Sequence, residues 1–413
     1  MHEHFDAQKA YAHVEALSSM RRLAGTPGEA AAQVYIREAG AGVGVEMLDE
    51  EFSYSDFPLK VAIPATCLAI GSLSVLGSLV YLWGSSLAII PGLALLLAVY
   101  LGFKWSGTFE RFASRGSRRS TNLIGNIPGS EAKGTVLLSA HYDSKSQLMP
   151  VILRAGLFMI GYFSAILFGI TLVVTGILAA AGQDLLASST GFYVSLLPPA
   201  LMLALAFNFT GNRSPGALDD AAGIAVILEA ARVVAQDPPV NFDVRVAAFG
   251  CEEVGLCGSI SHLLAHEDEL RQAPFYMLNY DMPFSSTGNI IVNTGFELPP
   301  VRTSRKLYGI IRETCKEMGF KLSGVYLPVG AGADHMPWVK HGFEATCFVS
   351  ATTSIHSAAD SLDKINREGL RRAGEVTLEV LRALDQDATS WSKKSSPAGA
   401  PAPESPLEEP RAT

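Results

Sequence analysis

The chain has 413 residues, a net charge of -8 at pH 7 and 17% charged residues, against about 25% in an ordinary soluble domain. Together with a mean hydropathy of +0.25, this composition indicates that part of the chain lies in lipid. The acidic balance and the lack of a basic run exclude nucleic acid as an expected partner, because phosphate binding needs a basic face. The five cysteines are widely spaced and are expected to be buried, reduced thiols.

The chain begins with a polar segment without an apolar core, which is not expected to be a signal peptide. Four apolar stretches follow, at residues 61–83, 87–103, 155–181 and 186–209. None of them contains Asp, Glu, Lys or Arg, and each is close to the length of about 20 residues that crosses a bilayer as a helix. Core helices of a soluble enzyme are the alternative, but four such runs exceed what one core needs. We therefore predict four transmembrane helices in a lipid bilayer.

The four stretches pair into two hairpins, at 58–104 and 151–211, which return the chain to the side from which it started. The hydrophilic segment between the hairpins is rich in Lys and Arg, whereas both hairpin tips have none. By the positive-inside rule, the hydrophilic part and both termini are predicted to be cytoplasmic. The chain is then expected to be an integral, multi-pass protein of the cell membrane.

Outside the hairpins, short apolar runs alternate with helical patterns. Strands are expected at 135–139, 242–249, 275–280 and 344–349, and helices at 221–235, 258–265, 303–318 and 367–384. This alternation predicts an α/β fold with a mainly parallel, mixed sheet that is covered by helices on both faces. In such folds the residues that bind ligands gather at the carboxyl ends of the strands.

The predicted hydrophilic domain is discontinuous and consists of residues 1–57, 105–150 and 212–388. The two hairpins are inserted between these segments. The final residues, 389–413, are rich in Pro, Ala and Ser without apolar periodicity, which predicts a disordered tail.

Histidine and acidic residues stand where several predicted strands end and where one helix begins. They are His141, Asp143, Asp219, Glu252, Glu253, Asp281 and His356. Imidazole nitrogens and carboxylate oxygens are ligands that zinc accepts, and five of them can hold two ions if one carboxylate bridges. A further acid would then remain as a base for hydrolysis. Each residue alone has a simpler structural explanation, such as an N-cap for Asp219, but their joint occurrence at successive strand ends favours a metal site.

Five motifs resemble those of the di-zinc exopeptidases of metallopeptidase family twenty-eight, whose best known members are bacterial leucyl aminopeptidases. They are His-Tyr-Asp at 141–143, Pro-Gly-Ala-Leu-Asp-Asp-Ala-Ala-Gly at 215–223, Phe-Gly-Cys-Glu-Glu-Val-Gly-Leu-Cys-Gly-Ser at 249–259, Asn-Tyr-Asp at 279–281, and His356 with Asp360. The resemblance covers roughly residues 5–56, 106–150 and 213–386. It implies a zinc-exopeptidase fold of the phosphorylase/hydrolase-like type.

The resemblance also implies two Zn²⁺ ions that share the carboxylate of Asp219. His141 and Asp281 would complete the ligands of one ion, and Glu253 and His356 those of the other. The family tends to hold the peptide bond after the bridging aspartate in cis, which sets the same expectation here.

Glu252 is implied to be the general base, and Asp143 a carboxylate that orients His141 from behind. Two cations about 3.5–4 Å apart lower the pKa of a shared water, and a base that is not itself a ligand can pass the water proton to the leaving amine. The expected function is that of a membrane-anchored, zinc-dependent exopeptidase that hydrolyses peptide substrates, with an aminopeptidase as the first choice.

Several other residues are expected to do less. Asp334 and His335 resemble a family segment near the site, but direct catalysis is not expected of them. His262 and His266, which share one helical face, are expected at the surface, and Cys251 is expected to serve packing.

Two further functions stay open. Related folds carry out glutaminyl cyclisation, an acyl transfer, with a single zinc, although retention of all five ligands argues against this. A non-catalytic binding module or a transport component is the other, although a spare Glu252 argues against a scaffold, and the lack of intramembrane charge argues against transport. The side-chain preference, the choice among aminopeptidase, carboxypeptidase and dipeptidase, and the oligomeric state are left undetermined.

Overall fold

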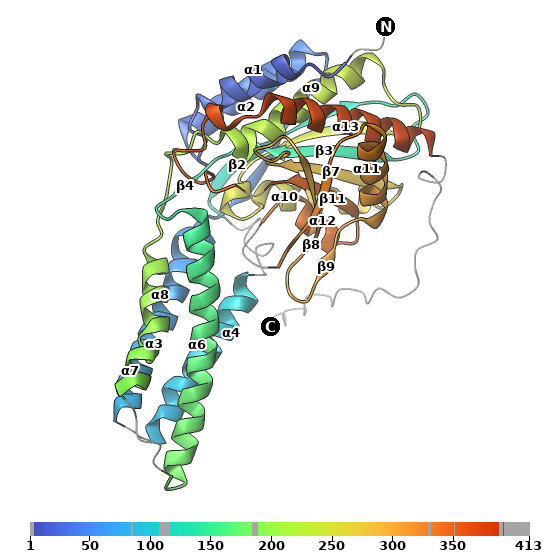
Figure 1. Cartoon of the computed structure of the whole chain (residues 1–413). Coiled ribbons are helices and arrows are strands. Elements are labelled where there is room, and N and C mark those ends of the chain that lie inside the picture. The colour runs from blue at the N-terminus through green and yellow to red at the C-terminus, as the bar shows by residue number, and fades with distance from the viewer. Residues whose placement is uncertain are drawn as a thin grey trace, which may run out of the picture.

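A computed structural model of the chain describes residues 4–83, 86–106, 116–183, 189–328, 332–350, 352–387 and Trp391. These residues form an α/β domain and a bundle of apolar helices that projects from one end of it (Figure 1). The expected α/β fold with a mixed sheet is therefore confirmed.

The main sheet of the α/β domain has the strand order β1-β2-β6-β3-β7-β11-β8-β10, with β9 paired to β8. Its strands are β1 (Met47–Tyr54), β2 (Arg118–Ile127), β3 (Thr135–His141), β6 (Asp243–Phe249), β7 (Phe275–Asp281), β8 (Ile290–Phe296), β9 (Val301–Arg302), β10 (Leu322–Leu327) and β11 (Glu344–Val349). The four central strands β6, β3, β7 and β11 are parallel, whereas β1, β2 and β8 join the sheet by antiparallel pairing. β3 and β6 are parallel, and their last residues, His141 and Phe249, lie opposite each other, so the carboxyl ends of the two strands are adjacent.

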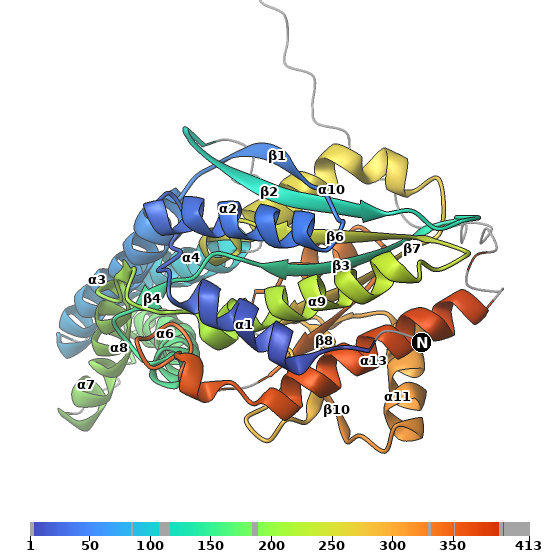
Figure 2. The same ribbon diagram turned by 90° about the horizontal axis from the view of Figure 1, so that it is seen from above.

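Alternate residues of the central strands pack into two cores on opposite faces of the sheet. On β3, Val136, Leu138 and Ala140 face one core, and Leu137 faces the other. The first core is covered by α1 (Ala7–Ser18), α2 (Pro27–Gly42), α9 (Ala222–Gln236), α11 (Arg305–Glu317) and α13 (Arg367–Gln386). The second is covered by α10 (Cys257–Leu270) and α12 (His335–Lys340). Figure 2 shows α1, α9 and α13 side by side on the first face. All five cysteines are free and buried, as expected.

Each expected strand and helix of the α/β domain is present, with ends that shift by a few residues. The sheet also has strands outside the central four, β1, β8, β9 and β10, that the sequence patterns did not indicate. These strands have mixed burial, and only the strands that are buried on both faces produce continuous apolar runs.

The bundle is built from two hairpins. The first contains α3 (Ile63–Leu82), entered through a π-helical turn at Pro58–Ala62, and α4 (Ile89–Ser106). The second contains α6 (Val151–Ala180), α7 (Ser189–Ser195) and α8 (Leu197–Ala206). Its base is closed by a two-stranded ladder of β4 (Ser146–Gln147) and β5 (Thr210–Gly211).

The expectation of four transmembrane helices is wrong in number. Among the described residues, two helices are long and apolar enough to cross a membrane, Pro58–Leu82 and Val151–Ala180. The other apolar helices, Ser86–Gly102 and Gly191–Ala206, are shorter. Proline explains part of this, because its ring clashes with the preceding turn of a helix and it lacks an N–H. The second hairpin accordingly breaks between Ser195 and Leu197, directly before Pro198 and Pro199.

Trp391 lies within the range assigned to the disordered tail, yet it is buried. Its ring stacks on Phe242 with the centroids 4.7 Å apart, and its Nε1–H donates to the carbonyl oxygen of Leu384 at 2.8 Å. The other residues of 389–413 lie outside the described part of the chain.

Candidate metal centre

The histidine and acidic residues singled out in the sequence gather at the carboxyl edge of the central strands. His141 ends β3, Asp281 ends β7, and His356 follows β11. Glu252 and Glu253 form a short turn after β6. Asp219 precedes α9, and the peptide bond between Asp219 and Asp220 is cis, as expected.

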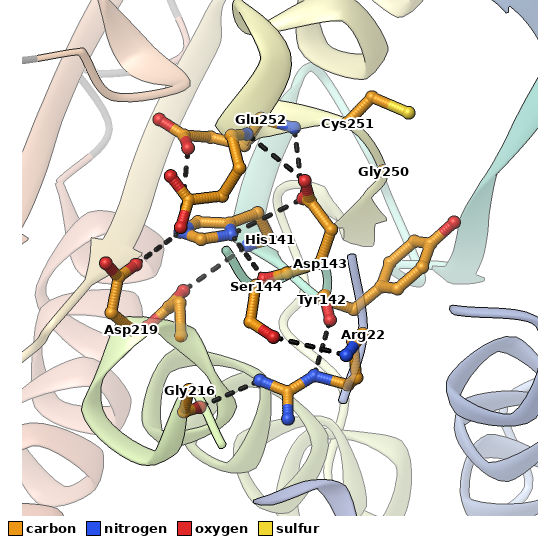
Figure 3. Close-up of polar contacts among 12 residues, drawn as sticks. Arg22, His141, Tyr142, Asp143, Ser144, Gly216, Asp219, Gly250, Cys251 and Glu252 are labelled. Atoms are coloured by element: carbon orange, nitrogen blue, oxygen red, sulfur yellow. Dashed lines mark hydrogen bonds and ion pairs between the residues drawn. The ribbon is translucent and has the colours of Figure 1, made fainter. Parts of the chain in front are cut away.

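The carboxylate of Asp219 lies between two imidazoles. Its Oδ1 lies 3.2 Å from Nε2 of His141, and its Oδ2 lies 3.1 Å from Nε2 of His356. Figure 3 shows the first of these contacts, with the imidazole of His141 held between Asp219 and Glu252. One carboxylate therefore presents a different oxygen to each histidine.

Two groups of potential metal ligands share Asp219. The first joins it to His141 and Asp281, the second joins it to Glu253 and His356, and within each group the ligand atoms lie within 4.8 Å of one another. Glu252 belongs to neither group, although its Oε2 is 3.9 Å from Nε2 of His141. The arrangement offers two sites with a common carboxylate and one acid to spare.

Asp143 was expected to orient His141, but its carboxylate mainly holds the turn after β6. Its oxygens accept the backbone N–H groups of Glu252 at 3.0 Å and Glu253 at 3.2 Å. Its contact with Nδ1 of His141 is longer, at 3.5 Å, and that nitrogen lies nearer the carbonyl oxygen of Asp143, at 3.2 Å. Asp143 thus ties β3 to the loop that carries both glutamates.

Two further buried carboxylates fix the segment around Asp219. Asp360 accepts the N–H groups of Leu218 at 2.8 Å and Asp219 at 3.2 Å. Asp220 accepts the N–H groups of Gly223 at 3.0 Å, Met282 at 3.2 Å and His141 at 3.3 Å. These bonds attach the start of α9 to the ends of β3 and β7.

Arg22 is a fully buried residue to which the sequence analysis gave no role. Its guanidinium donates to the carbonyl oxygens of Tyr142 at 2.7 Å, Pro215 at 2.8 Å and Gly216 at 2.8 Å, and so joins the two loops that bear His141 and Asp219 (Figure 3). Burial lowers the pKa of Arg22 to about 10. Its partners are backbone carbonyls, which leave no sequence signal.

Two cations reach the second ligand group. Nζ of Lys145 lies 2.6 Å from Oε2 of Glu253. Arg154, in the first turn of the apolar helix α6, places a guanidinium nitrogen 3.3 Å from Nδ1 of His356. The base of the bundle therefore contacts the candidate site directly.

The carboxyl groups of this edge differ in their affinity for protons. Burial, with the nearby carboxylates, raises the pKa of Glu252 well above its usual value and that of Asp281 to about 7. Burial also acts to raise the pKa of Glu253, but His356 and Lys145 outweigh it and lower that pKa to about 2. Burial raises the pKa of Asp334 to about 8, and its carboxylate has no hydrogen-bond partner among the described residues. This excess of buried acid is a charge imbalance that a divalent cation relieves.

The residues present fit two zinc ions. The donors are imidazole nitrogens and carboxylate oxygens, which zinc accepts. Among the described residues, the buried Nε2 of His141 has only the 3.2 Å ion-pair contact with Asp219 and no aligned hydrogen bond. Lys145 contacts Oε2 of Glu253, which is also the oxygen that lies 3.2 Å from Nε2 of His356. The second ion would have to displace that ammonium group.

Two residues that were not expected to take part in catalysis, His262 and Cys251, lie outside both ligand groups. His262 was expected at the surface and is instead buried, because its ring packs between Phe249 and Trp338. Cys251 is buried, with its thiol 3.8 Å from a carboxylate oxygen of Glu29.

Comparison with known proteins shows similarity to a peptidase family over part of the chain. The sequence profile of peptidase family M28 matches residues 199–381. The aminopeptidase YwaD of Bacillus subtilis (strain 168) is 32% identical over 187 residues, which are 42% of this chain and 39% of that relative. The aligned region thus spans well under half of the relative's length.

Solved structures share the fold over most of the chain. A zinc aminopeptidase from Bacillus subtilis superposes with a TM-score of 0.55 at 17% identity, covering 92% of this chain and 95% of the other. A glutaminyl cyclase from an Acidobacteriales bacterium gives 0.54 at 17% identity, covering 94% and 97%. The chain is thus similar to peptidase family M28 and to an aminopeptidase over part of its length, while its fold is shared by an aminopeptidase and a glutaminyl cyclase.

Proposed function

We propose that the chain is a membrane-anchored, zinc-dependent aminopeptidase. The observation that carries the proposal is the placement of Asp219, which faces His141 with one oxygen and His356 with the other, while Glu252 lies outside both ligand groups. A hydrolase with two ions needs this division between ligands and a free base. The YwaD relative is named an aminopeptidase, which supports the choice of reaction.

In this proposal one ion is held by His141, Asp219 and Asp281, and the other by Asp219, Glu253 and His356. When bound, the two ions would lower the pKa of a water and stabilise the negative charge that develops on the scissile carbonyl oxygen. The loops are held in place by Asp143, Asp220 and Asp360, so that the ligands meet without a rearrangement of the backbone.

Glu252 is the proposed general base. Its carboxylate reaches toward His141 from the turn after β6, and Asp143 holds the backbone N–H of Glu252. It would take a proton from the attacking water and deliver it to the leaving amine, so its carboxylate must stay free of metal.

The membrane anchor is proposed from the surface of the bundle. Most of the large apolar side chains that are exposed in the described residues lie on its helices, and on α6 they include Ile160, Phe163, Leu167 and Ile177. Monomeric soluble proteins rarely expose a continuous apolar surface of this extent. We infer that Pro58–Leu82 and Val151–Ala180 enter the bilayer and that the shorter helices lead the chain back to the α/β domain.

The same proposal divides the chain into a discontinuous catalytic domain, 1–57, 105–150 and 212–388, and two inserted hairpins, 58–104 and 151–211. The Lys and Arg residues between the hairpins favour a cytoplasmic catalytic domain. Access of a membrane-impermeant thiol reagent to a cysteine placed at exposed Leu264, in right-side-out and inverted vesicles, tests the orientation.

Glutaminyl cyclisation is the second candidate, because a glutaminyl cyclase shares the fold over nearly the whole chain. It needs one zinc ion, whereas this chain presents two ligand groups. A non-catalytic role would leave Glu252 without a purpose.

A substrate panel on the detergent-purified chain separates the candidates. We expect chelator-sensitive release of N-terminal residues from aminoacyl anilides and small peptides, no cleavage of the same peptides after N-acetylation, and two zinc ions that are lost when Asp219 is replaced. Ring closure of N-terminal glutaminyl peptides, with a single zinc ion at the Asp219 cluster, would instead establish the cyclase. Inactivity on both substrate sets with zinc present would refute catalysis of either kind.

A further inference from the structure

A second group of metal-ligating side chains lies away from the site described above. Glu50 of β1 and His262 and His266 of α10 place their ligand atoms within 4.8 Å of one another. None of the three belongs to either group around Asp219. Nδ1 of His262 is 2.7 Å and Nε2 of His266 is 3.1 Å from the same oxygen, Oε2 of Glu50.

The spacing of the two histidines produces this convergence. Residues four apart lie on the same face of a helix, so His262 and His266 project side by side, with ring centroids 4.6 Å apart. β1 runs along the edge of the sheet and is covered by α10, which brings Glu50 beneath both rings. A single carboxylate oxygen thus receives two imidazoles from one helix.

Two imidazoles and one glutamate are a set that zinc accepts, with a fourth position left for water. Zinc–ligand distances of about 2.0–2.2 Å put tetrahedral donor atoms about 3.3 Å apart, so the present separations would need to widen by only a few tenths of an ångström. Partial exposure leaves a path for an ion, since the side chain of Glu50 is 25% exposed and that of His266 is 33% exposed. His262, packed between Phe249 and Trp338, is held by its surroundings.

The surrounding charges suit a metal ligand. Nδ1 of His266 lies 3.5 Å from a carboxylate oxygen of Glu269, which is placed to accept the ring N–H when Nε2 holds a metal. Glu269 in turn is paired with Arg245. Asn122 lies 3.5 Å from the second oxygen of Glu50. The cluster therefore has outer partners for two of its three members.

We propose that Glu50, His262 and His266 form a third metal site, selective for zinc-like divalent ions, that clamps the edge strand β1 to α10. β1 leads through Tyr54 into the first apolar hairpin, so an ion here fastens the root of that hairpin to the α/β domain. The site does not depend on the proposed peptidase function, because it shares no ligand with the central cluster.

Zinc content of the full-length chain in zinc-buffered detergent solution tests the site. The test variants are Glu50→Gln and His266→Gln, both at partly exposed positions. The matched control is His341→Gln, because His341 also pairs with a glutamate of α10, Glu267 at 3.1 Å, and belongs to none of the potential ligand groups found among the described residues. We expect wild type and the control to hold one more zinc per chain than the two test variants.

The same comparison in an Asp219→Asn background isolates the third ion from the central pair. There we expect a single zinc site whose affinity for zinc falls by more than about 100-fold with His266→Gln. Loss of a residue that only hydrogen-bonds a metal ligand already costs about 10–100-fold, and His266 is itself a proposed ligand. If a test variant does not fold, the Co²⁺ absorption spectrum of the Asp219→Asn chain decides, with a tetrahedral spectrum expected. Equal zinc content in all four forms, or no tetrahedral Co²⁺ spectrum, would overturn the proposal.

Discussion

The α/β domain and the apolar bundle place polar and apolar side chains in opposite ways. The domain buries carboxylates and imidazoles at the carboxyl ends of its central strands, where Asp143 and Asp360 accept backbone N–H groups. The bundle keeps its interior apolar and also presents apolar side chains outward, from Leu76 on α3 to Leu167 on α6. The two regions are therefore suited to different surroundings, and Arg154 at the base of α6 is a point where they touch.

This contrast shows how one chain can combine hydrolysis with a lipid environment. Buried charge is tolerated where partners are preorganised, and exposed apolar surface is tolerated where the surroundings are not water. We therefore expect different effects from substitutions in the α/β domain, in the apolar bundle and at the contact between them.

The largest effect is expected at the polar edge. Glu252→Gln should lower kcat by about 10³-fold, because a general base contributes about 10²–10⁴-fold, while both zinc ions stay bound. Glu253→Gln is the matched change one residue on and should reduce zinc content instead. Steady-state kinetics with metal analysis on the two variants gives the answer, and loss of zinc from Glu252→Gln would reverse the two roles.

The same substitution in the two regions should have unequal effects. Leu167, on α6, is 67% exposed, and Leu264, on α10, is 46% exposed. A lysine at the centre of a membrane helix costs about 2.5–3.5 kcal/mol, whereas a surface change elsewhere stays within about 0.5 kcal/mol. Leu167→Lys should therefore reduce the amount of chain recovered in the membrane fraction, and Leu264→Lys should leave it unchanged. Equal recovery would argue that the bundle does not face lipid.

A buried acid of the α/β domain should make stability depend on pH. Burial raises the pKa of Glu29 from 4.5 to about 7. Between these values the folded chain holds a proton that the unfolded chain has lost, so stability falls as pH rises. From pH 5 to pH 8 the free energy of unfolding should fall by about 2 kcal/mol relative to that of Glu29→Gln.

Unfolding in detergent at several pH values measures this difference. Glu38→Gln, at an exposed position on the same helix, is the control and should follow wild type throughout. A constant gap between wild type and Glu29→Gln would mean that Glu29 keeps an ordinary pKa.

The smallest effect is expected where the regions meet. When Nε2 of His356 holds a metal, its Nδ1 must carry the proton, which then points at the guanidinium of Arg154. Arg154→Ala removes the repulsion between the guanidinium and this N–H, together with a nearby positive charge. The zinc ion at Asp219, Glu253 and His356 should then bind about fivefold more tightly, or by about 1 kcal/mol. Leu153→Ala, on the same turn and 51% exposed, is the control. Chelator competition measures the affinity, and weaker binding would mean that Arg154 supports the ligand.

Much of the fold could be predicted from sequence where burial leaves a pattern. The central strands were found because both faces are buried, as in β7. The number of long apolar helices was not predicted correctly, because hydropathy depends on composition alone. Prolines such as Pro198 decide where a helix is interrupted. Strands outside the central four, such as β1 and β10, were missed because their burial patterns are irregular.

The residues of the candidate site were found because carboxylates and histidines at strand ends are visible in sequence. The residues that hold these ligands in place were not found. Arg22 bonds to backbone carbonyls, and Arg154 lies on a helix of the apolar bundle. The burial of His262 was likewise missed, because the rings that cover it come from distant segments.

The ladder at the base of the second hairpin offers a natural place to shorten the chain. Ser146 stands opposite Gly211 and Gln147 opposite Thr210, so the segments that enter and leave the insertion already run as an antiparallel pair. A two-residue turn closes such a pair. Replacing residues 148–209 by Asn-Gly would thus remove the helices of the second hairpin in one deletion. The N–H of Gln147 would still donate to the carbonyl oxygen of His356.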